Sequence, residues 1–224
     1  MASYPSTVAS TTRSSALATN KVLRNTYLLL GATLAFSALT AGISMMLNLP
    51  HPGILITLVG YFGLLFAVHK TQNSSWGLLF IFLLTGFMGL TLGPIISMYL
   101  KFLPNGAEVV TTALGVTAAT FVGLSAYAVK SQKDFSFMGG FLMVGIIGAF
   151  LLGLVAMFFN MPTLSLVVSG VFVIAMAGLI LYQTSAIIHG GETNYIMATV
   201  TLYVSIYNLF TSLLHLLGAT SGDD

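Results

Sequence analysis

The sequence has no cysteine, and only 5% of its 224 residues are charged. Without cysteine, the chain has no disulfide, thiolate nucleophile or cysteine-bound metal site. A soluble domain has about 25% charged residues, so this chain could not cover its surface in water. Its mean hydropathy is +0.99, and 57% of its residues are hydrophobic. The composition therefore predicts an integral membrane protein whose solvent is the lipid bilayer, with no nucleic-acid partner.

Seven apolar runs approach or exceed the length of about 20 residues that a membrane-spanning helix needs. They occupy residues 26–47, 53–69, 77–100, 109–129, 138–159, 163–188 and 195–217. The second run is short and the sixth is long, which helix tilt can absorb. We therefore predict an all-α bundle of seven transmembrane helices over residues 25–218. A flexible tail (1–24) precedes it, and a short tail (219–224) follows it.

Basic residues orient this predicted bundle, because Lys and Arg accumulate in cytoplasmic loops. With a cytoplasmic N-terminus, six of the seven fall on the cytoplasmic side: Arg13, Lys21, Arg24, Lys70, Lys130 and Lys133. Only Lys101 falls on the opposite side, where short turns contain four prolines, namely Pro50, Pro52, Pro104 and Pro162. The C-terminus is then expected to be periplasmic. A transit peptide is the alternative interpretation of the acid-free, Ser/Thr-rich N-terminus.

The seventh predicted span has polar residues at intervals of three and four. They are Thr201, Ser205, Asn208, Ser212 and His215. This spacing places them on one helix face, which we call the span-seven stripe. Since lipid penalises polar groups, the stripe is expected to face the bundle interior or a water-filled cleft. Interhelical hydrogen bonding and the lining of an ion or proton path both fit. Gln183 on the sixth span is expected to hydrogen-bond span seven near Ser205 or Asn208.

The third predicted span combines small residues with a proline: Gly86, Gly89, Gly93 and Pro94. Small residues allow neighbouring helices to approach closely. Pro94 removes one backbone hydrogen bond and is expected to kink the helix near Leu90. Tight packing and a gating hinge are the two interpretations of Gly93 and Pro94.

Catalytic and metal-binding patterns are missing from the sequence. No carboxylate lies in any predicted span, although cation-coupled transporters usually have one there. The stretch HGGE at 189–192 differs from the HExxH zinc motif, and hydrolase and nucleotide-binding glycine motifs are absent. We expect no enzyme, no cofactor and no metal. His189 is interpreted as a helix end, and Glu192 as the start of the next helix, with Thr193 or Asn194 as its cap.

Four segments in chain order resemble a known family. They read LGPIISMY (92–99), ALGVTAATFVGLSAYA (113–128), DFSFMGGFLMVGI (134–146) and HGGETNYIMATVTLYVSIYNLF (189–210). Together they resemble the transmembrane Bax inhibitor motif family of seven-helix membrane proteins, over about residues 20–218. Two further stretches resemble its bacterial inner-membrane branch: NKVLRNTYLLL (20–30) and IIHGGETNYI (187–196).

The resemblance implies two activities. The first is binding to an FtsH-type membrane protease, which pulls in such proteins as slow substrates through the N-terminal tail and is restrained by them. In this chain the tail includes Arg13, Lys21 and Arg24. The second is a pH-sensitive calcium leak that depends on two facing aspartates. At these positions the chain has Gln183 and Ser205, which do not ionise near neutral pH. A leak of calcium or protons is therefore the alternative function, weakened by the missing acids.

Overall fold

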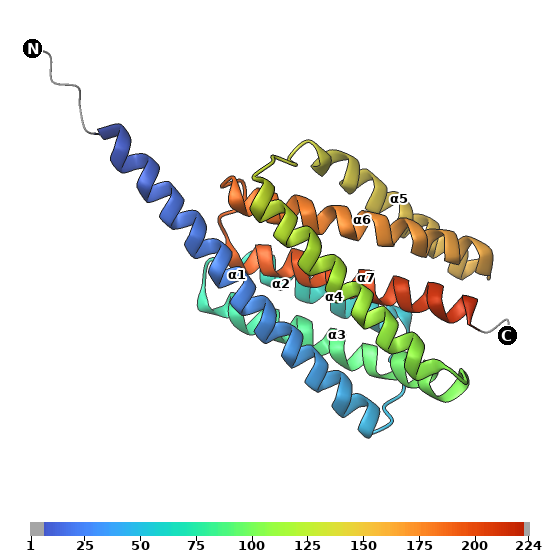
Figure 1. Ribbon diagram of the computed structural model, residues 1–224. Helices are drawn as coiled ribbons and strands as arrows, with labels where there is room; N and C mark the ends of the chain where they lie inside the picture. The colour runs from blue at the N-terminus through green and yellow to red at the C-terminus, as the bar shows by residue number, and fades with distance from the viewer. Residues whose placement is uncertain (1–6, 222–224) are drawn as a thin grey trace, which may run out of the picture.

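The computed structural model describes residues 7–221, with side chains from Thr19 onward. Within this part of the chain the secondary structure consists of seven α-helices and no strand (Figure 1). They are α1 (Thr7–Met46), α2 (Ile54–Thr71), α3 (Ser75–Phe102), α4 (Gly106–Ser131), α5 (Met138–Phe158), α6 (Pro162–Ile188) and α7 (Tyr195–Thr220). Each helix contains a stretch long and apolar enough to cross a membrane. The prediction of an all-α protein with seven membrane-length helices is confirmed, while the orientation of its termini stays a prediction.

The first helix begins earlier than the sequence indicates. It starts at Thr7, inside the segment 1–24 expected to be a tail, and its membrane-length part is Thr19–Met46. At 1.5 Å per residue, its 40 residues extend about 60 Å, roughly twice the ~30 Å of a hydrocarbon core. The start of α1 accordingly projects beyond the other helices (Figure 1). Residues 1–6 and 222–224, and the side chain of Arg13, lie outside what the structure describes.

Three charged side chains lie near the boundaries of membrane-length segments. Glu108, expected outside the fourth span, lies exposed in the first turn of α4. Lys21 and Arg24 lie exposed on α1, among the first six residues of its membrane-length part. These charged side chains therefore sit near the ends of membrane-length segments, where long side chains can reach the membrane surface.

Helix α7 lies at the centre of the bundle. It packs against α1, α2, α3, α4 and α6, whereas the backbone of α5 lies close to that of α6 alone among the described helices (Figure 1). Leu202, Leu209 and Leu214 on α7 are at most 1% exposed. Their neighbours in the core include Leu30 of α1 and Ile180 of α6. The least apolar span of the sequence is thus shielded from lipid over much of its surface by its neighbours.

Helices α1 and α3 form an unusually close contact, which we call the α1–α3 seam. On α3 it consists of Gly86, Gly89 and Gly93, and on α1 of Phe36, Ser37, Thr40, Ala41 and Ser44. A Cβ atom on Gly93 would lie 2.6 Å from the Ser44 Cβ, and one on Gly89 would overlap Thr40 and the Ser37 backbone. Only glycine fits here, which is the tight packing that the small residues predict.

The seam also supports Pro94, which lies inside α3 without ending the helix. Proline has no N–H, so the carbonyl of Leu90, four residues earlier, loses its donor within the helix. The hydroxyl of Ser44 donates to this carbonyl at 2.9 Å. An unpaired carbonyl in hydrocarbon is strongly unfavourable, and Ser44 prevents it. The expected kink near Leu90 itself stays a prediction.

We expect Ser44→Ala to lower the free energy of unfolding by about 0.6–2 kcal/mol, because the Leu90 carbonyl loses the hydroxyl that replaces the missing N–H of Pro94. Pro94→Ala restores a backbone N–H that can reach the same carbonyl. The effect of Ser44→Ala should therefore shrink in the Pro94→Ala background. A double-mutant cycle on denaturant unfolding in detergent measures this coupling. Equal losses in both backgrounds would contradict the role assigned to Ser44.

Candidate functional site

Gln183 is the most conspicuous polar side chain inside the bundle. It is 4% exposed on α6, and its amide nitrogen has no hydrogen-bond partner. The expected bond to span seven is not made by this nitrogen. Ser205 instead donates to the Thr201 carbonyl at 2.7 Å, and Asn208 donates to the Val204 carbonyl at 2.8 Å. Both follow the tendency of short polar side chains to bond one turn back along their own helix.

Gln183 and Ser205 lie at different depths in the membrane, which explains why the expected hydrogen bond is not made. Helices α6 and α7 run in opposite directions from a short turn at residues 189–194. Gln183 lies five residues before the end of α6, whereas Ser205 lies ten residues after the start of α7. A five-residue difference corresponds to roughly 7 Å along the helix axis. Gln183 is therefore level with the region around Val200 rather than with Ser205.

Other unpaired polar atoms lie at this end of the bundle. The hydroxyls of Thr26 on α1 and Ser125 on α4 are also buried without a partner. Thr199 of α7 donates to the Thr26 carbonyl at 3.3 Å. Next along the chain, the hydroxyl groups of Tyr27 and Thr184 share a 3.3 Å hydrogen bond between α1 and α6. We call this group the polar core; it consists of Thr26, Tyr27, Ser125, Gln183, Thr184 and Thr199. Isolated Thr and Ser residues in apolar runs have no periodicity, so sequence reasoning missed Thr26 and Ser125.

The span-seven stripe faces the protein only in part. Ser205 and Ser212 are buried, whereas Thr201, Asn208 and His215 are half-buried. His215 Nδ1 lies 2.8 Å from the Ser169 hydroxyl of α6. Among the hydrogen bonds of the described residues, this is the stripe's one bond to another helix.

Two tyrosines on the side of α7 away from the stripe join this helix to its neighbours. The hydroxyl of Tyr203 donates to the Thr85 carbonyl of α3 at 3.3 Å, and it lies 2.7 Å from the Ser37 hydroxyl of α1. Since Tyr203 has one proton to donate, Ser37 is the donor in the second bond. Tyr207 and Thr91 share a further bond at 3.3 Å. Sequence reasoning missed this network because neither tyrosine belongs to the polar spacing of the stripe.

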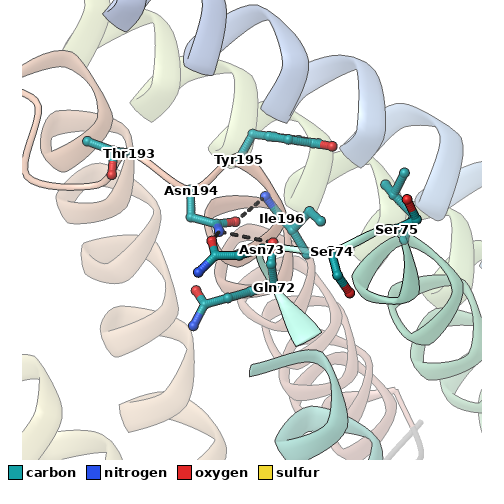
Figure 2. A pocket seen from close by; sticks show the side chains of 9 residues that line it. Gln72, Asn73, Ser74, Ser75, Thr193, Asn194, Tyr195 and Ile196 are labelled. Carbon is teal, nitrogen blue, oxygen red and sulfur yellow. Dashed lines mark hydrogen bonds between the residues drawn. The ribbon is translucent and has the colours of Figure 1, made fainter. Parts of the chain in front are cut away.

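A polar cavity of about 450 Å³ lies where the α6–α7 turn meets the α2–α3 turn (Figure 2). Asn194 joins the two turns. Its side-chain oxygen accepts from the backbone N–H groups of Ile196 and Met197, at 2.9 and 3.1 Å. Its nitrogen donates to the Gln72 carbonyl at 3.1 Å and to the Asn73 side chain at 2.9 Å. Asn194, one of the two candidates, is thus the cap of α7.

The residues of the HGGE stretch (189–192) bond backbone groups at helix ends and turns. His189 follows α6, with Nδ1 2.9 Å from the Ser185 carbonyl and Nε2 3.2 Å from the Gln132 carbonyl of the α4–α5 turn. Gly190 has φ +76°, which a glycine adopts readily. Glu192 accepts from the Asn194 backbone N–H at 2.8 Å. No group of three His, Asp or Glu side chains that could hold a metal occurs in the described residues.

His189 also affects the carboxyl group of Asp134 in the α4–α5 turn. Hydrogen bonds from the Ser136 side chain and backbone hold the pKa of Asp134 below its usual value, and the neighbouring His189 lowers that pKa further. Ser185 accepts from the Phe135 backbone N–H at 3.0 Å in the same turn. These contacts fasten the α4–α5 turn to the end of α6.

Comparison with known proteins identifies the family. A family model described as "Inhibitor of apoptosis-promoting Bax1" matches residues 19–222. The chain belongs to this family. It is 53% identical over 212 residues to the modulator of FtsH protease YccA of Escherichia coli K12, covering 94% of this chain and 95% of the relative. It is 55% identical over 203 residues to an uncharacterized protein of Pseudomonas aeruginosa, covering 91% of each chain.

Membership of the family agrees with the architecture. The matched residues include every described helix from the apolar part of α1 to the end of α7. A relative of the same identity, from Escherichia coli O6:H1, is named inner membrane protein YccA. The chain is accordingly a multi-pass protein of the bacterial inner membrane.

We expect Gln183→Met to raise the free energy of unfolding by about 1–3 kcal/mol, because it removes an unpaired buried amide while keeping a similar volume. Thr199→Val is the matched change in the polar core. It removes bonds to the carbonyls of Thr26 and Tyr195 and should lower stability. Thermal unfolding in detergent compares the two variants. A loss for Gln183→Met as large as that for Thr199→Val would mean that the amide has a partner.

Proposed function

We propose that this protein restrains an FtsH-type membrane protease, which engages it as a slow substrate through the N-terminal segment 1–24. The observation that carries the proposal is the 53% identity, over 94% of this chain, to a protein named modulator of FtsH protease. A slow substrate must offer an accessible end and then resist removal from the membrane. The structure supports both requirements.

The accessible end is the start of α1. It projects past the bundle, and Lys21 and Arg24 lie exposed where the apolar stretch begins (Figure 1). Moving a Lys or Arg to the centre of a bilayer is unfavourable by about 2.5–3.5 kcal/mol on insertion scales. In the predicted orientation these charges hold the segment on the cytoplasmic side, where the proposed engagement takes place.

Resistance to removal comes from the contacts of the same helix. A protease that pulls from the N-terminus must displace α1 first, and α1 packs against α3, α6 and α7. Its displacement would break the bonds of Ser37 to Tyr203 and of Ser44 to Leu90. The Leu90 carbonyl would then be unpaired inside the membrane, which is unfavourable. These contacts support slow extraction.

Deletion of residues 2–18 tests the proposed engagement. It leaves the apolar stretch of α1, Lys21 and Arg24 in place. We expect the truncated protein to be degraded several-fold more slowly and a second reporter substrate of the protease to be cleaved at its uninhibited rate. Both rates are measured with purified protease in proteoliposomes. If the truncated protein is still degraded and still inhibits, engagement through the tail is wrong.

Two glycine variants separate engagement from resistance in the same assay. Gly89→Ala would force the α1–α3 seam apart, whereas a Cβ on Gly115 of α4 meets nothing within 4 Å. Gly89→Ala should therefore be degraded faster and inhibit less, and Gly115→Ala should behave as wild type. Unchanged degradation of Gly89→Ala would show that the seam does not limit extraction.

The second candidate function is an ion leak, favoured by the unpaired buried polar atoms of Thr26, Ser125 and Gln183. Among the described helices the one acidic side chain is Glu108, which lies exposed at a helix end. We therefore expect any flux to lack a carboxylate-dependent response to pH; the titratable side chain in the span-seven stripe is His215. Gln183→Asp combined with Ser205→Asp would introduce carboxylates and make the flux depend on their titration.

Calcium and proton flux into dye-loaded liposomes at several pH values measures this activity. A wild-type flux equal to that of empty liposomes at every pH would exclude the leak. A flux that is equally pH-dependent in wild type and in His215→Gln would contradict the assignment of Gln183 and Ser205 as the positions that lack the sensor.

A further inference from the structure

We propose that the protein binds one phospholipid with an anionic headgroup in a groove between α2 and α7. This groove has a volume of about 570 Å³, and we call it the α2–α7 groove. Its apolar lining includes Phe62, Leu65 and Phe66 of α2, and Val200 and Val204 of α7. The proposal concerns a different surface from the polar core and does not depend on the proposed protease function.

The groove exists because α2 is held mainly from one side. Helix α2 packs against α3 and sparsely against α7, and it forms no helix contact with α6. Helix α6 contributes Leu179 to the lining. The rings of Phe62 on α2 and Phe150 on α5 lie 6.0 Å apart, so aromatic side chains cross the gap there. Within a bilayer a gap lined by such residues is filled by hydrocarbon.

One end of the groove is basic. His69 lines it, and Lys70 follows in the last turn of α2, with both side chains exposed. No acidic residue occurs on α2, in the α2–α3 turn or on α3. Along the opposite wall, the acid nearest to α7 in the sequence is Glu192, which accepts from the Asn194 backbone N–H in the α6–α7 turn and does not line the groove. The charge at this mouth therefore complements a phosphate-containing headgroup.

A hydroxyl lies below the basic mouth. Thr199 and Thr211 of α7 each donate to the carbonyl four residues earlier. Thr201 lines the groove, and its hydroxyl makes no hydrogen bond among those of the described residues. It lies six residues into α7, about 9 Å along the axis. A hydroxyl in hydrocarbon needs an acceptor, and the ester carbonyls of a phospholipid lie just below its phosphate.

The length of the groove favours a lipid over a partner helix. From His69 to Tyr61 the lining spans eight residues of α2, about 12 Å at the helical rise. This is less than half of a ~30 Å hydrocarbon core, whereas a partner's transmembrane helix would contact the full depth. One acyl chain from one leaflet fits this length, with its phosphate at His69 and Lys70 and an ester carbonyl at Thr201.

Native mass spectrometry of the purified full chain, with phosphatidylglycerol or phosphatidylcholine added, tests the proposal. We expect one tightly bound phosphatidylglycerol, with several-fold preference over phosphatidylcholine. The double variant His69→Gln with Lys70→Gln should lose this preference. Lys130→Gln, an exposed lysine in the last turn of α4, is the matched control and should keep it. If the double variant keeps the preference, or the control loses it, the basic mouth does not select the anionic headgroup.

Two further variants test the interior of the groove. Thr201→Val should weaken the binding of both lipids several-fold, because the ester loses its donor. Val204→Trp should fill the groove and abolish the bound lipid, with helicity and the melting temperature confirming that the variant is folded. A folded Val204→Trp protein that still binds one phosphatidylglycerol would overturn the site. A photo-crosslinker at Phe66 that captures a membrane protein in native membranes, and no lipid, would also do so.

Discussion

Hydrocarbon offers no hydrogen bonds, and this constraint governs the structure around α1 and α3. Pro94 leaves the Leu90 carbonyl without a donor inside the membrane, and Ser44 supplies one at 2.9 Å from the neighbouring helix. Ser44 reaches this carbonyl only because Gly89 and Gly93 let the two backbones approach so closely. The glycines, the proline and the serine therefore form one unit. The glycines allow the close approach, and the serine supplies the donor that the proline lacks.

Helix α7 extends this unit through the bundle. Tyr203 bonds both the Ser37 hydroxyl on α1 and the Thr85 carbonyl on α3, so one buried side chain joins three helices. By contrast, Ser205 and Asn208 bond carbonyls of their own helix and join nothing. Polar residues of α7 thus fall into two groups. Ser205 and Asn208 bond their own helix, whereas Tyr203 and Thr199 bond neighbouring helices.

This difference explains how far the sequence predicts the structure. The seven helices follow from the length of the apolar runs, and the close approach at Gly89 and Gly93 follows from residue size. The expected contact of Gln183 with Ser205 fails because helix periodicity fixes the face of a residue and not its depth relative to another helix. The polar core and the α2–α7 groove depend on which helices become neighbours. Single residues such as Thr26 and Thr201 do not indicate this in the sequence.

The arrangement of bonds along α1 bears on how the protein could resist a protease. From Thr19 onward, where the structure describes side chains, four hydrogen bonds join this helix to its neighbours, made by Thr26, Tyr27, Ser37 and Ser44 with three different helices. They are spread along the membrane-spanning part of α1, so a pull along its axis loads all of them together. A slide of one helical turn, about 5.4 Å, would break every one and would move Thr40 and Ser44 away from Gly89 and Gly93. Extraction from the N-terminus therefore has no small first step. By contrast, the backbone of α5 lies close to α6 only, so the removal of α5 would separate mainly one helix pair.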